Sequence, residues 1–144
     1  MSNWIYPNGI ACVAVPTRNG IEAYGFIYRI DIDDKYYIGK KIFYTTKKKW
    51  FGKKKLATMT DARLKKYEYV KKPSNWMTYC SSSEEIRKLV EEGHVPERYI
   101  LQVCYSKKEL TFMENKWLYS NIQNRQNIND NISGMFFKEE IKLW

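Results

Sequence analysis

Residues 24–43 read YGFIYRIDIDDKYYIGKKIF, and this stretch decides the fold. Residues 24–30 are mostly apolar and aromatic, which predicts a strand. The polar residues 31–35 predict a turn, and residues 36–43 predict a second strand that returns beside the first. One face of the first strand is expected to carry Tyr24, Phe26, Tyr28 and Ile30.

The length of the turn sets which residues of the two strands lie opposite one another. A four-residue loop places Tyr28 opposite Tyr37, whereas a two-residue loop places Ile30 opposite Tyr37 and Tyr28 one step diagonal to it. In both registers the two tyrosines share a face. The hairpin therefore predicts two phenol hydroxyls close together.

Two capping patterns mark helices further along the chain. Ser82 with Glu85 fits a capping box, and the helix that it opens ends at Gly93. Ser106 with Glu109 forms a second box. The helix that follows carries an apolar stripe made of Leu110, Met113, Trp117, Leu118 and Ile122.

Two further strands complete the prediction, a short one within residues 11–15 and a longer one over 98–105. In the longer strand we expect Ile100, Gln102 and Cys104 to face one side. The basic stretch between the hairpin and the first capped helix is expected to be helical. The order of elements predicts a small α+β fold with helices against an antiparallel or mixed sheet, and 144 residues fit one domain.

Positive charge is concentrated in one part of the chain. Residues 35–72 hold 14 of the 25 Lys and Arg residues and two acids, so they carry +12 and the rest of the chain carries −3, for a net charge of +9. Aromatic residues run through the same window. Such a mixture suits a surface that neutralises phosphates and packs on sugars or bases. The alternative is a solvated lysine face above a core that uses the aromatics.

Composition excludes several classes of protein. Three cysteines without a Cys-x-x-Cys pair indicate neither a disulfide framework nor a zinc knuckle. A single histidine, His94, excludes chemistry that needs two, and its place after Gly93 favours a role at a helix end. No apolar run is long enough to span a membrane, and residues 1–8 do not resemble a signal peptide. We therefore expect a cytoplasmic protein with no membrane contact and no implied protein partner.

Glu114 interrupts the apolar stripe of the last helix. It lies four residues after Leu110 and four before Leu118, so its carboxylate falls on or beside the buried face. A buried carboxylate needs a cation, a metal, hydrogen bonds or a proton. Pairing with a lysine and a functional role are both open from periodicity alone.

The two halves of the hairpin resemble the paired signature of the GIY-YIG nuclease superfamily. Tyr24-Gly25-Phe26-Ile27-Tyr28 is followed nine positions after Tyr28 by Tyr37-Ile38-Gly39-Lys40-Lys41. In detail the chain is most similar to the phage-borne, free-standing Seg-type (SegE-like) homing endonucleases. That similarity also rests on Ser74-Asn75-Trp76, Tyr79-Cys80-Ser81-Ser82 and Cys104-Tyr105-Ser106-Lys107. The resemblance implies a central three-stranded sheet, a nuclease domain over residues 24–144 and an N-terminal extension over 1–23 that adds a strand.

The family implies hydrolysis of DNA phosphodiester bonds with one divalent cation, Mg²⁺ or Mn²⁺. Tyr28 would be the general base, and Glu114 would hold the metal. Tyr37 would hydrogen-bond the attacked phosphate or share in proton handling. A phenol acts as a base only if positive charge stabilises the phenolate, which Lys40 and Lys41 are placed to supply.

Three further positions follow from the same resemblance. Gly39 would let the backbone approach the phosphate closely. Asn129, 15 residues beyond Glu114, matches the family asparagine, with Asn131 as its rival and turn formation as the structural alternative. The family arginine falls on Lys47, unless Arg63 reaches in from later in the chain.

DNA contacts are expected from cations of the basic window. These are Lys40, Lys48, Lys49, Lys53, Lys54, Lys55 and Arg63. Two other functions stay open at this stage: a DNA-binding module of the same fold with impaired catalysis, and a basic RNA-binding protein.

Overall fold

A computed structural model describes residues 3–132, 134 and 136–138 of the chain. Its centre is a mixed five-stranded sheet with the strand order β2-β1-β9-β5-β6. The strands are β1 (Trp4–Ile5), β2 (Ala11–Cys12), β5 (Gly25–Ile32), β6 (Lys35–Ile42) and β9 (Glu97–Cys104). The predicted small α+β fold is confirmed, and β1 and β2 continue the central strands β9, β5 and β6 on the β9 side.

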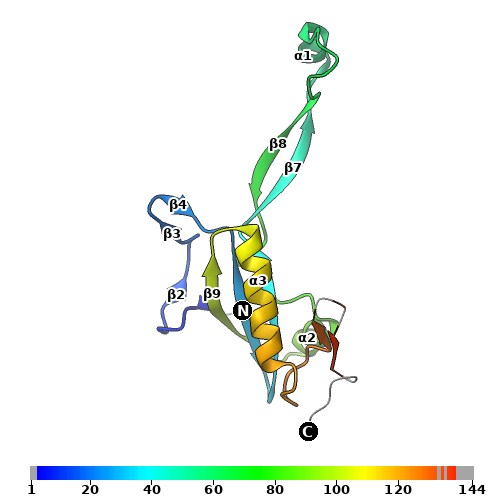
Figure 1. Ribbon diagram of the computed structural model, residues 1–144. Coiled ribbons are helices and arrows are strands. Elements are labelled where there is room, and N and C mark those ends of the chain that lie inside the picture. Colours follow the sequence, from blue (N-terminus) through cyan, green and yellow to red (C-terminus); the bar gives the residue numbers. More distant parts are fainter. Residues whose placement is uncertain (1–2, 133, 135, 139–144) are drawn as a thin grey trace.

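The helices lie on opposite faces of this sheet. Helix α3 (Lys107–Asn121) runs along one face (Figure 1), and α2 (Glu84–Glu91) covers the other. Three two-stranded units accompany them, two of them short and one long. These are β3 (Thr17–Arg18) with β4 (Ile21–Glu22), β7 (Tyr44–Trp50) with β8 (Tyr67–Pro73), and β10 (Asn131–Ile132) with β11 (Phe136–Phe137). Among the described residues, no helix is long and apolar enough to cross a membrane.

The hairpin of β5 and β6 has the shorter of the two expected turns. Asp33 and Asp34 form a two-residue turn, with Asp33 in the left-handed region at φ 54°. Ile30 consequently lies opposite Tyr37, and Tyr28 lies opposite Gly39. The two tyrosines share a face, as both registers required.

The sheet has an apolar core on each face. The core under α2 is rich in aromatic rings and contains Trp4, Phe26, Tyr28, Phe43, Trp76 and Ile86. The core under α3 is mostly aliphatic and contains Ile27, Ile38, Leu110, Leu118 and Ile122. This division follows from the alternation of β5, whose side chains point to the two faces in turn.

Strand β9 does not keep the expected alternation. Its pairing with β5 shifts between Gln102, opposite Ile27, and Ile100, opposite Tyr28, so Leu101 is an extra residue in the ladder. Ile100 packs in the aromatic core whereas Cys104 packs in the aliphatic one. The prediction that both face one side was wrong, because apolar residues on both faces of the strand hid the bulge.

The two helix starts compare differently with prediction. Ser106 caps α3 by accepting a hydrogen bond from the Glu109 N–H, as expected. For α2 the cap is Ser83, which accepts from the Ile86 N–H, so the helix begins one residue later than the box at Ser82 implied. This shift leaves the Ser82 hydroxyl available for another contact.

The basic window contains a long β-hairpin where a helical region was expected. Residues 44–73, called the arm below, comprise β7, the short helix α1 (Lys53–Thr58) and β8, and they project away from the sheet (Figure 1). The expectation was wrong because lysine runs suit a helix and an exposed ribbon equally well. Pairing over seven residues from each strand forms the ribbon.

Candidate active site

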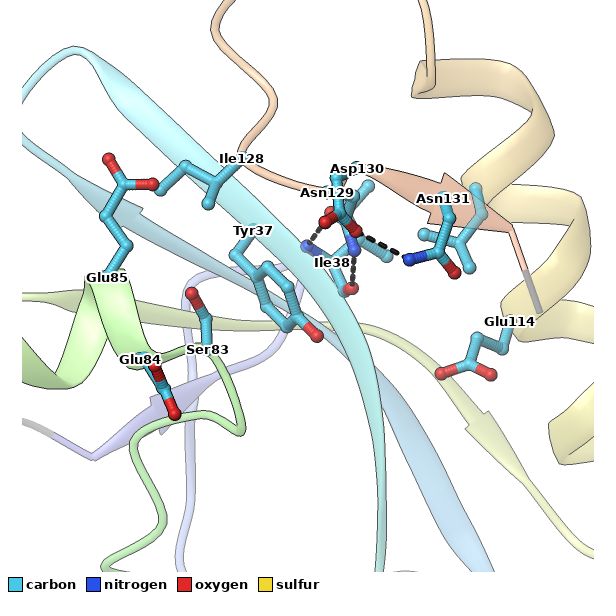
Figure 2. A pocket seen from close by; sticks show the side chains of 11 residues that line it. Tyr37, Ile38, Ser83, Glu84, Glu85, Glu114, Ile128, Asn129, Asp130 and Asn131 are labelled. Atoms are coloured by element: carbon cyan, nitrogen blue, oxygen red, sulfur yellow. Dashed lines mark hydrogen bonds between the residues drawn. The ribbon is translucent and has the colours of Figure 1, made fainter. Parts of the chain in front are cut away.

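A pocket of about 430 Å³ opens at the outer edge of β6 (Figure 2). It is bounded by β6, the start of α2, the middle of α3 and the loop after α3. The lining residues are Tyr37, Ile38, Ser83, Glu84, Glu85, Glu114, Leu118, Ile128, Asn129, Asp130 and Asn131. Residues from both faces of the sheet meet here because β6 is the edge strand.

Glu114 reaches this pocket from α3. Its side chain keeps 20% of its exposure, and Lys40 Nζ lies 3.6 Å from its Oε1. Burial raises the pKa of the Glu114 carboxyl, and the positive charge of Lys40 partly offsets that rise. The pairing with a lysine, one of the two interpretations of the interrupted stripe, is therefore present, and the side chain also opens to the pocket. The functional role stays a prediction.

Tyr37 contributes a half-buried phenol to the same pocket. Its hydroxyl forms a 3.2 Å hydrogen bond with the Ser82 hydroxyl. Burial raises the pKa of Tyr37, and the bond to Ser82 acts in the opposite direction. At neutral pH the group is therefore a neutral phenol, able to donate one hydrogen bond and accept another.

Tyr28 lies beneath the site and does not line the pocket. Its side chain is 1% exposed, and its ring centre is 6.2 Å from that of Tyr37. Burial strongly raises the pKa of Tyr28, so its neutral form is favoured. In this conformation the buried Tyr28 ring packs against the Tyr37 ring from the core side.

The space beside Gly39 is filled by the Tyr28 ring. A Cβ atom at residue 39 would come within 2.4 Å of the Tyr28 hydroxyl oxygen. Gly39 is therefore required for the packing of one tyrosine against the neighbouring strand. This differs from the expected close approach of its backbone to a phosphate, since the room is taken by a side chain.

Lys40 and Lys41 point to opposite faces of β6. Lys40 joins Glu114 on the α3 side, whereas Lys41 lies with its Nζ 4.0 Å above the Tyr79 ring. Lys41 also donates a 2.7 Å hydrogen bond to Asn75 Oδ1, and partial burial lowers the pKa of its ammonium group. Tyr79 packs edge-on against Tyr28, so the Lys41 charge lies one ring away from the buried phenol.

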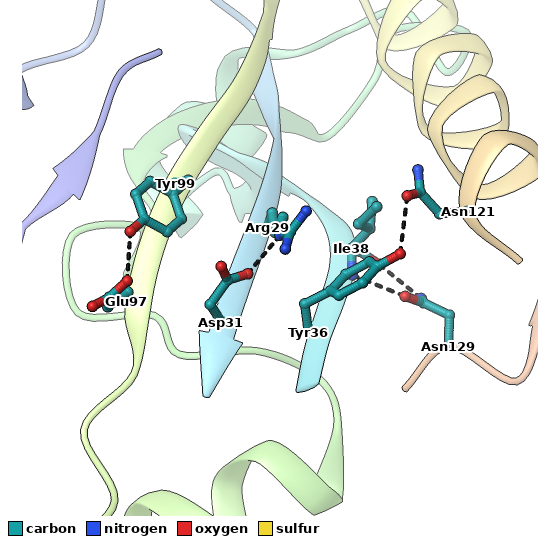
Figure 3. Close-up of polar contacts among 8 residues, drawn as sticks. All are labelled: Arg29, Asp31, Tyr36, Ile38, Glu97, Tyr99, Asn121 and Asn129. Carbon is teal, nitrogen blue, oxygen red and sulfur yellow. Dashed lines mark hydrogen bonds and ion pairs between the residues drawn. The ribbon is translucent and has the colours of Figure 1, made fainter. Parts of the chain in front are cut away.

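Asn129 is fully engaged with the backbone of β6 (Figures 2 and 3). Its Oδ1 accepts from the Ile38 N–H at 2.9 Å, and its Nδ2 donates to the Ile38 carbonyl at 2.8 Å. Asn131 instead bonds Asp130 and the Gly134 N–H within its own loop. Asn129 thus positions the strand that carries Tyr37, and Asn131 shapes the turn.

The arm cations lie outside the pocket lining. Lys47 belongs to β7 on the exposed ribbon, opposite Val70. Arg63 is near the tip of the arm, where it pairs with Asp61 at 3.2 Å and its side chain is 91% exposed. Neither residue lines the pocket, whereas Lys40 pairs with Glu114 and Lys41 lies over the ring that packs against Tyr28.

The loop before α2 supplies contacts to which sequence reasoning gave no role. Ser82 bonds Tyr37, while Tyr79 and Asn75 surround Lys41. Ser81 is held at φ 125°, a backbone region that favours glycine, and its hydroxyl accepts from the Ser83 N–H. The sequence signal for these contacts was the run of Ser81, Ser82 and Ser83 at the start of the helix, because a helix cap uses only one hydroxyl.

The donor set fits a weakly held hard cation. Among the described residues, no group of three or more His, Cys, Asp or Glu side chains could hold a metal ion. Glu114 opens to a pocket that also presents the oxygens of Asp130, Asn131 and Tyr37. Two carboxylates, those of Glu114 and Asp130, with neutral oxygens and room for water suit Mg²⁺, which keeps much of its hydration shell and relies on substrate phosphates.

Comparison with known proteins identifies the family. Residues 14–141 match the family model described as "Putative endonuclease segE, GIY-YIG domain". Neither the curated proteins nor the solved structures gave a match. The matched range includes the hairpin, the arm, Glu114 and Asn129, and therefore most of the chain. The chain belongs to the SegE-type GIY-YIG family, whose domain is that of a nuclease acting on DNA.

Proposed function

We propose that this protein is a metal-dependent DNA endonuclease of the homing type, encoded by a phage or mobile element, and that it cuts phosphodiester bonds at the edge of β6. The observation that carries the proposal is that the Tyr37 hydroxyl and the Glu114 carboxylate line one pocket. A phenol and a carboxylate that are 77 positions apart have no need to share a polar pocket for packing alone.

Glu114 would hold one Mg²⁺ or Mn²⁺ ion, with waters and a substrate phosphate as the other ligands. The bound ion would neutralise charge on the phosphate and on the leaving oxygen. Lys40 favours the ionised form of the Glu114 carboxyl and so partly offsets the rise in its pKa that burial causes. It would also draw the phosphate toward the pocket.

Tyr37 would orient the attacking water or the phosphate through its hydroxyl. Because burial raises its pKa, Tyr37 enters the reaction as a neutral phenol. Its oxygen would accept a proton from the attacking water while its own hydroxyl proton passes to the exposed Ser82 hydroxyl and on to solvent. The hydrogen bond with the Ser82 hydroxyl holds the Tyr37 phenol in place and links it to a second hydroxyl. Tyr28 would act as a positioning residue, with Lys41 stabilising negative charge that develops on this face of β6.

DNA would be bound by cations that follow the arm away from the pocket. Lys40 stands at the pocket and Lys48, Lys49, Lys53, Lys54, Lys55 and Arg63 lie on the arm. Phosphate contacts of this kind give affinity that falls steeply with salt. The arm therefore lengthens the DNA-binding surface beyond the reaction centre.

Nicking of a supercoiled plasmid tests the proposal. We expect Mg²⁺-dependent conversion by the wild-type chain and none by Glu114→Gln. Glu91→Gln, an exposed substitution on α2 with the same charge change, is the matched control and should cut normally. Full cutting by Glu114→Gln would disprove the metal role. Retention of DNA on a gel without any product would favour the impaired DNA-binding module.

A further inference from the structure

The two faces of the arm differ in chemistry. The pairing register and the alternation of side chains place Tyr44, Lys48, Trp50, Tyr67, Tyr69 and Lys71 on one face. Ring contacts agree, since Tyr67 packs edge-on against Trp50 at 5.2 Å and against Tyr69 at 5.6 Å. The opposite face carries Lys47, Lys49 and Lys72 around Val70. The arm is thus a ribbon with one aromatic face and one lysine face.

Beyond its base, the aromatic face is not part of a core. Trp50 is 66% exposed and Tyr69 is 59% exposed, although both are large apolar side chains. At the base of this face Tyr44 packs against the core of the protein and bonds Glu22. The outer part, which carries Trp50, Tyr67 and Tyr69, packs only within the arm among the described residues. Large exposed aromatics of this kind mark a binding surface.

Charge identifies the class of partner. The arm holds eleven Lys and Arg residues and two acids, which gives +9, so it carries the whole net charge of +9 and the remaining residues sum to zero. Cations stand on both faces, with Lys48 above the Tyr67 ring on the aromatic face. A ribbon with positive charge on both faces complements a groove that has a row of phosphates on each side.

We propose that the arm lies in the major groove of duplex DNA, with its aromatic face on the base edges and its lysines on the flanking phosphates. The inference rests on the proposed function for its substrate and adds how that substrate is read. The major groove of B-form DNA is about 12 Å wide and admits a two-stranded ribbon, whereas the minor groove, about 6 Å wide, does not.

Stacking on single strands fits the arm less well. The Tyr67 ring packs against Trp50 and Tyr69 and has Lys48 above it, so only Trp50 and Tyr69 keep exposed ring surface on which a base could stack. Duplex RNA fits less well too, since its A-form major groove is too narrow for side chains to read.

The arm extends from one side of the sheet. Its seven paired residues, at about 3.3 Å each, carry it about 23 Å beyond the sheet. The groove contact would therefore lie on one flank of the cut phosphate and bias which phosphate is cut.

Two multiple variants of the full-length chain test the two faces separately. Lys47→Gln with Lys49→Gln and Lys72→Gln should weaken duplex DNA binding at least tenfold and lower the salt slope by about 0.9 for each phosphate that is no longer neutralised. Trp50→Ala with Tyr69→Ala should leave the salt slope unchanged and flatten the distribution of cuts on a long DNA. Lys107→Gln with Lys108→Gln and Lys116→Gln, three exposed changes on α3, is the charge-matched control and should alter neither property.

Groove competitors decide the geometry. Methyl green, which occupies the major groove, should displace the protein from duplex DNA, and distamycin, which occupies the minor groove, should not. Displacement by distamycin alone, or tighter binding to single-stranded DNA or duplex RNA than to duplex DNA, would overturn the inference.

Binding and cutting are measured separately, so that the two proposals fail in different ways. Unchanged affinity and salt slope in the lysine-face variant, with cutting intact, would overturn the arm inference and leave the nuclease standing. Major-groove binding that depends on the arm, in a chain that cuts no DNA with Mg²⁺ or Mn²⁺, would support the arm inference and reject the nuclease.

Discussion

The Asn129 side chain and the backbone of Ile38 form a closed pair of hydrogen bonds, in which the amide takes the place of a neighbouring strand. The pair extends a backbone ladder in which Tyr36 bonds Gln126 and Ile128. The edge of β6 is therefore closed up to the residue that follows Tyr37. This closure fixes the position of the pocket along the strand.

Asn129→Asp should destabilise the protein by about 1–3 kcal/mol, because an acceptor then faces the Ile38 carbonyl and a buried carbonyl loses its donor. Thermal unfolding measures the loss. Asn131→Asp, at a half-buried position in β10, is the control and should cost much less. An equal cost at both positions would contradict the bracing role of Asn129.

Gly39→Ala should cost about 1–3 kcal/mol, since the new Cβ would meet the Tyr28 hydroxyl oxygen at 2.4 Å and the ring is enclosed. Gly52→Ala is the matched control, because nothing lies within 4 Å of its Cβ position. Urea unfolding compares the two variants. Equal stabilities would show that the Tyr28 ring moves freely.

Tyr37→Phe should slow cleavage about a hundredfold, the usual size of a proton-transfer contribution, with little change in melting temperature. Tyr28→Phe should mainly reduce stability, by about 1 kcal/mol, because it removes a buried hydroxyl. Single-turnover rates and thermal melts on both variants separate these effects. A larger rate loss at Tyr28 would mean that Tyr28 is the general base after all and becomes accessible in the DNA complex.

Glu114→Gln should abolish metal-dependent cutting without lowering the melting temperature. The pKa of Glu114 is raised in the folded state, so ionisation of Glu114 costs stability once the pH rises above the unfolded value. The neutral amide removes that cost. A marked fall in melting temperature would show that the pair with Lys40 stabilises the fold.

The pH dependence of cleavage should show the influence of Lys40. Activity requires the Glu114 carboxylate, so the rate should fall as the pH drops through the Glu114 pKa. Lys40→Gln removes the charge that lowers this pKa, and the acid limb of the pH–rate profile should move to higher pH. Lys88→Gln on α2 is the control. An unmoved limb in Lys40→Gln would exclude the electrostatic coupling.

The sequence predicted the parts of the fold that depend on local patterns. The hairpin of β5 and β6 follows from the alternation of side chains. The start of α3 follows from Ser106, a single serine placed to cap the helix. The Leu101 bulge was not visible, since the strand is apolar on both sides of it. The arm was not visible either, because repeated lysines favour no single backbone conformation.

The sequence predicted which residues belong to the candidate site better than it predicted how deeply each of them is buried. Glu114 in an apolar stripe pointed to a special environment, and the structure gives it both a lysine and a pocket. The burial of Tyr28 could not be foreseen, because it depends on the rings of Trp4 and Tyr79, which lie far from Tyr28 in the sequence. The hydrogen bond between Ser82 and Tyr37 depends on a helix cap that lies one residue later than predicted.

The arm joins the body of the protein through two neighbouring residues, Tyr44 and Pro73, which are paired at its base. Its length can consequently change by evolution or engineering without disturbing the sheet. Adding two residues to each strand would move the tip outward by about 6.6 Å and keep every outward side chain on its side. Adding one residue to each strand would turn the aromatic and lysine surfaces over, so reach and orientation can be tuned separately.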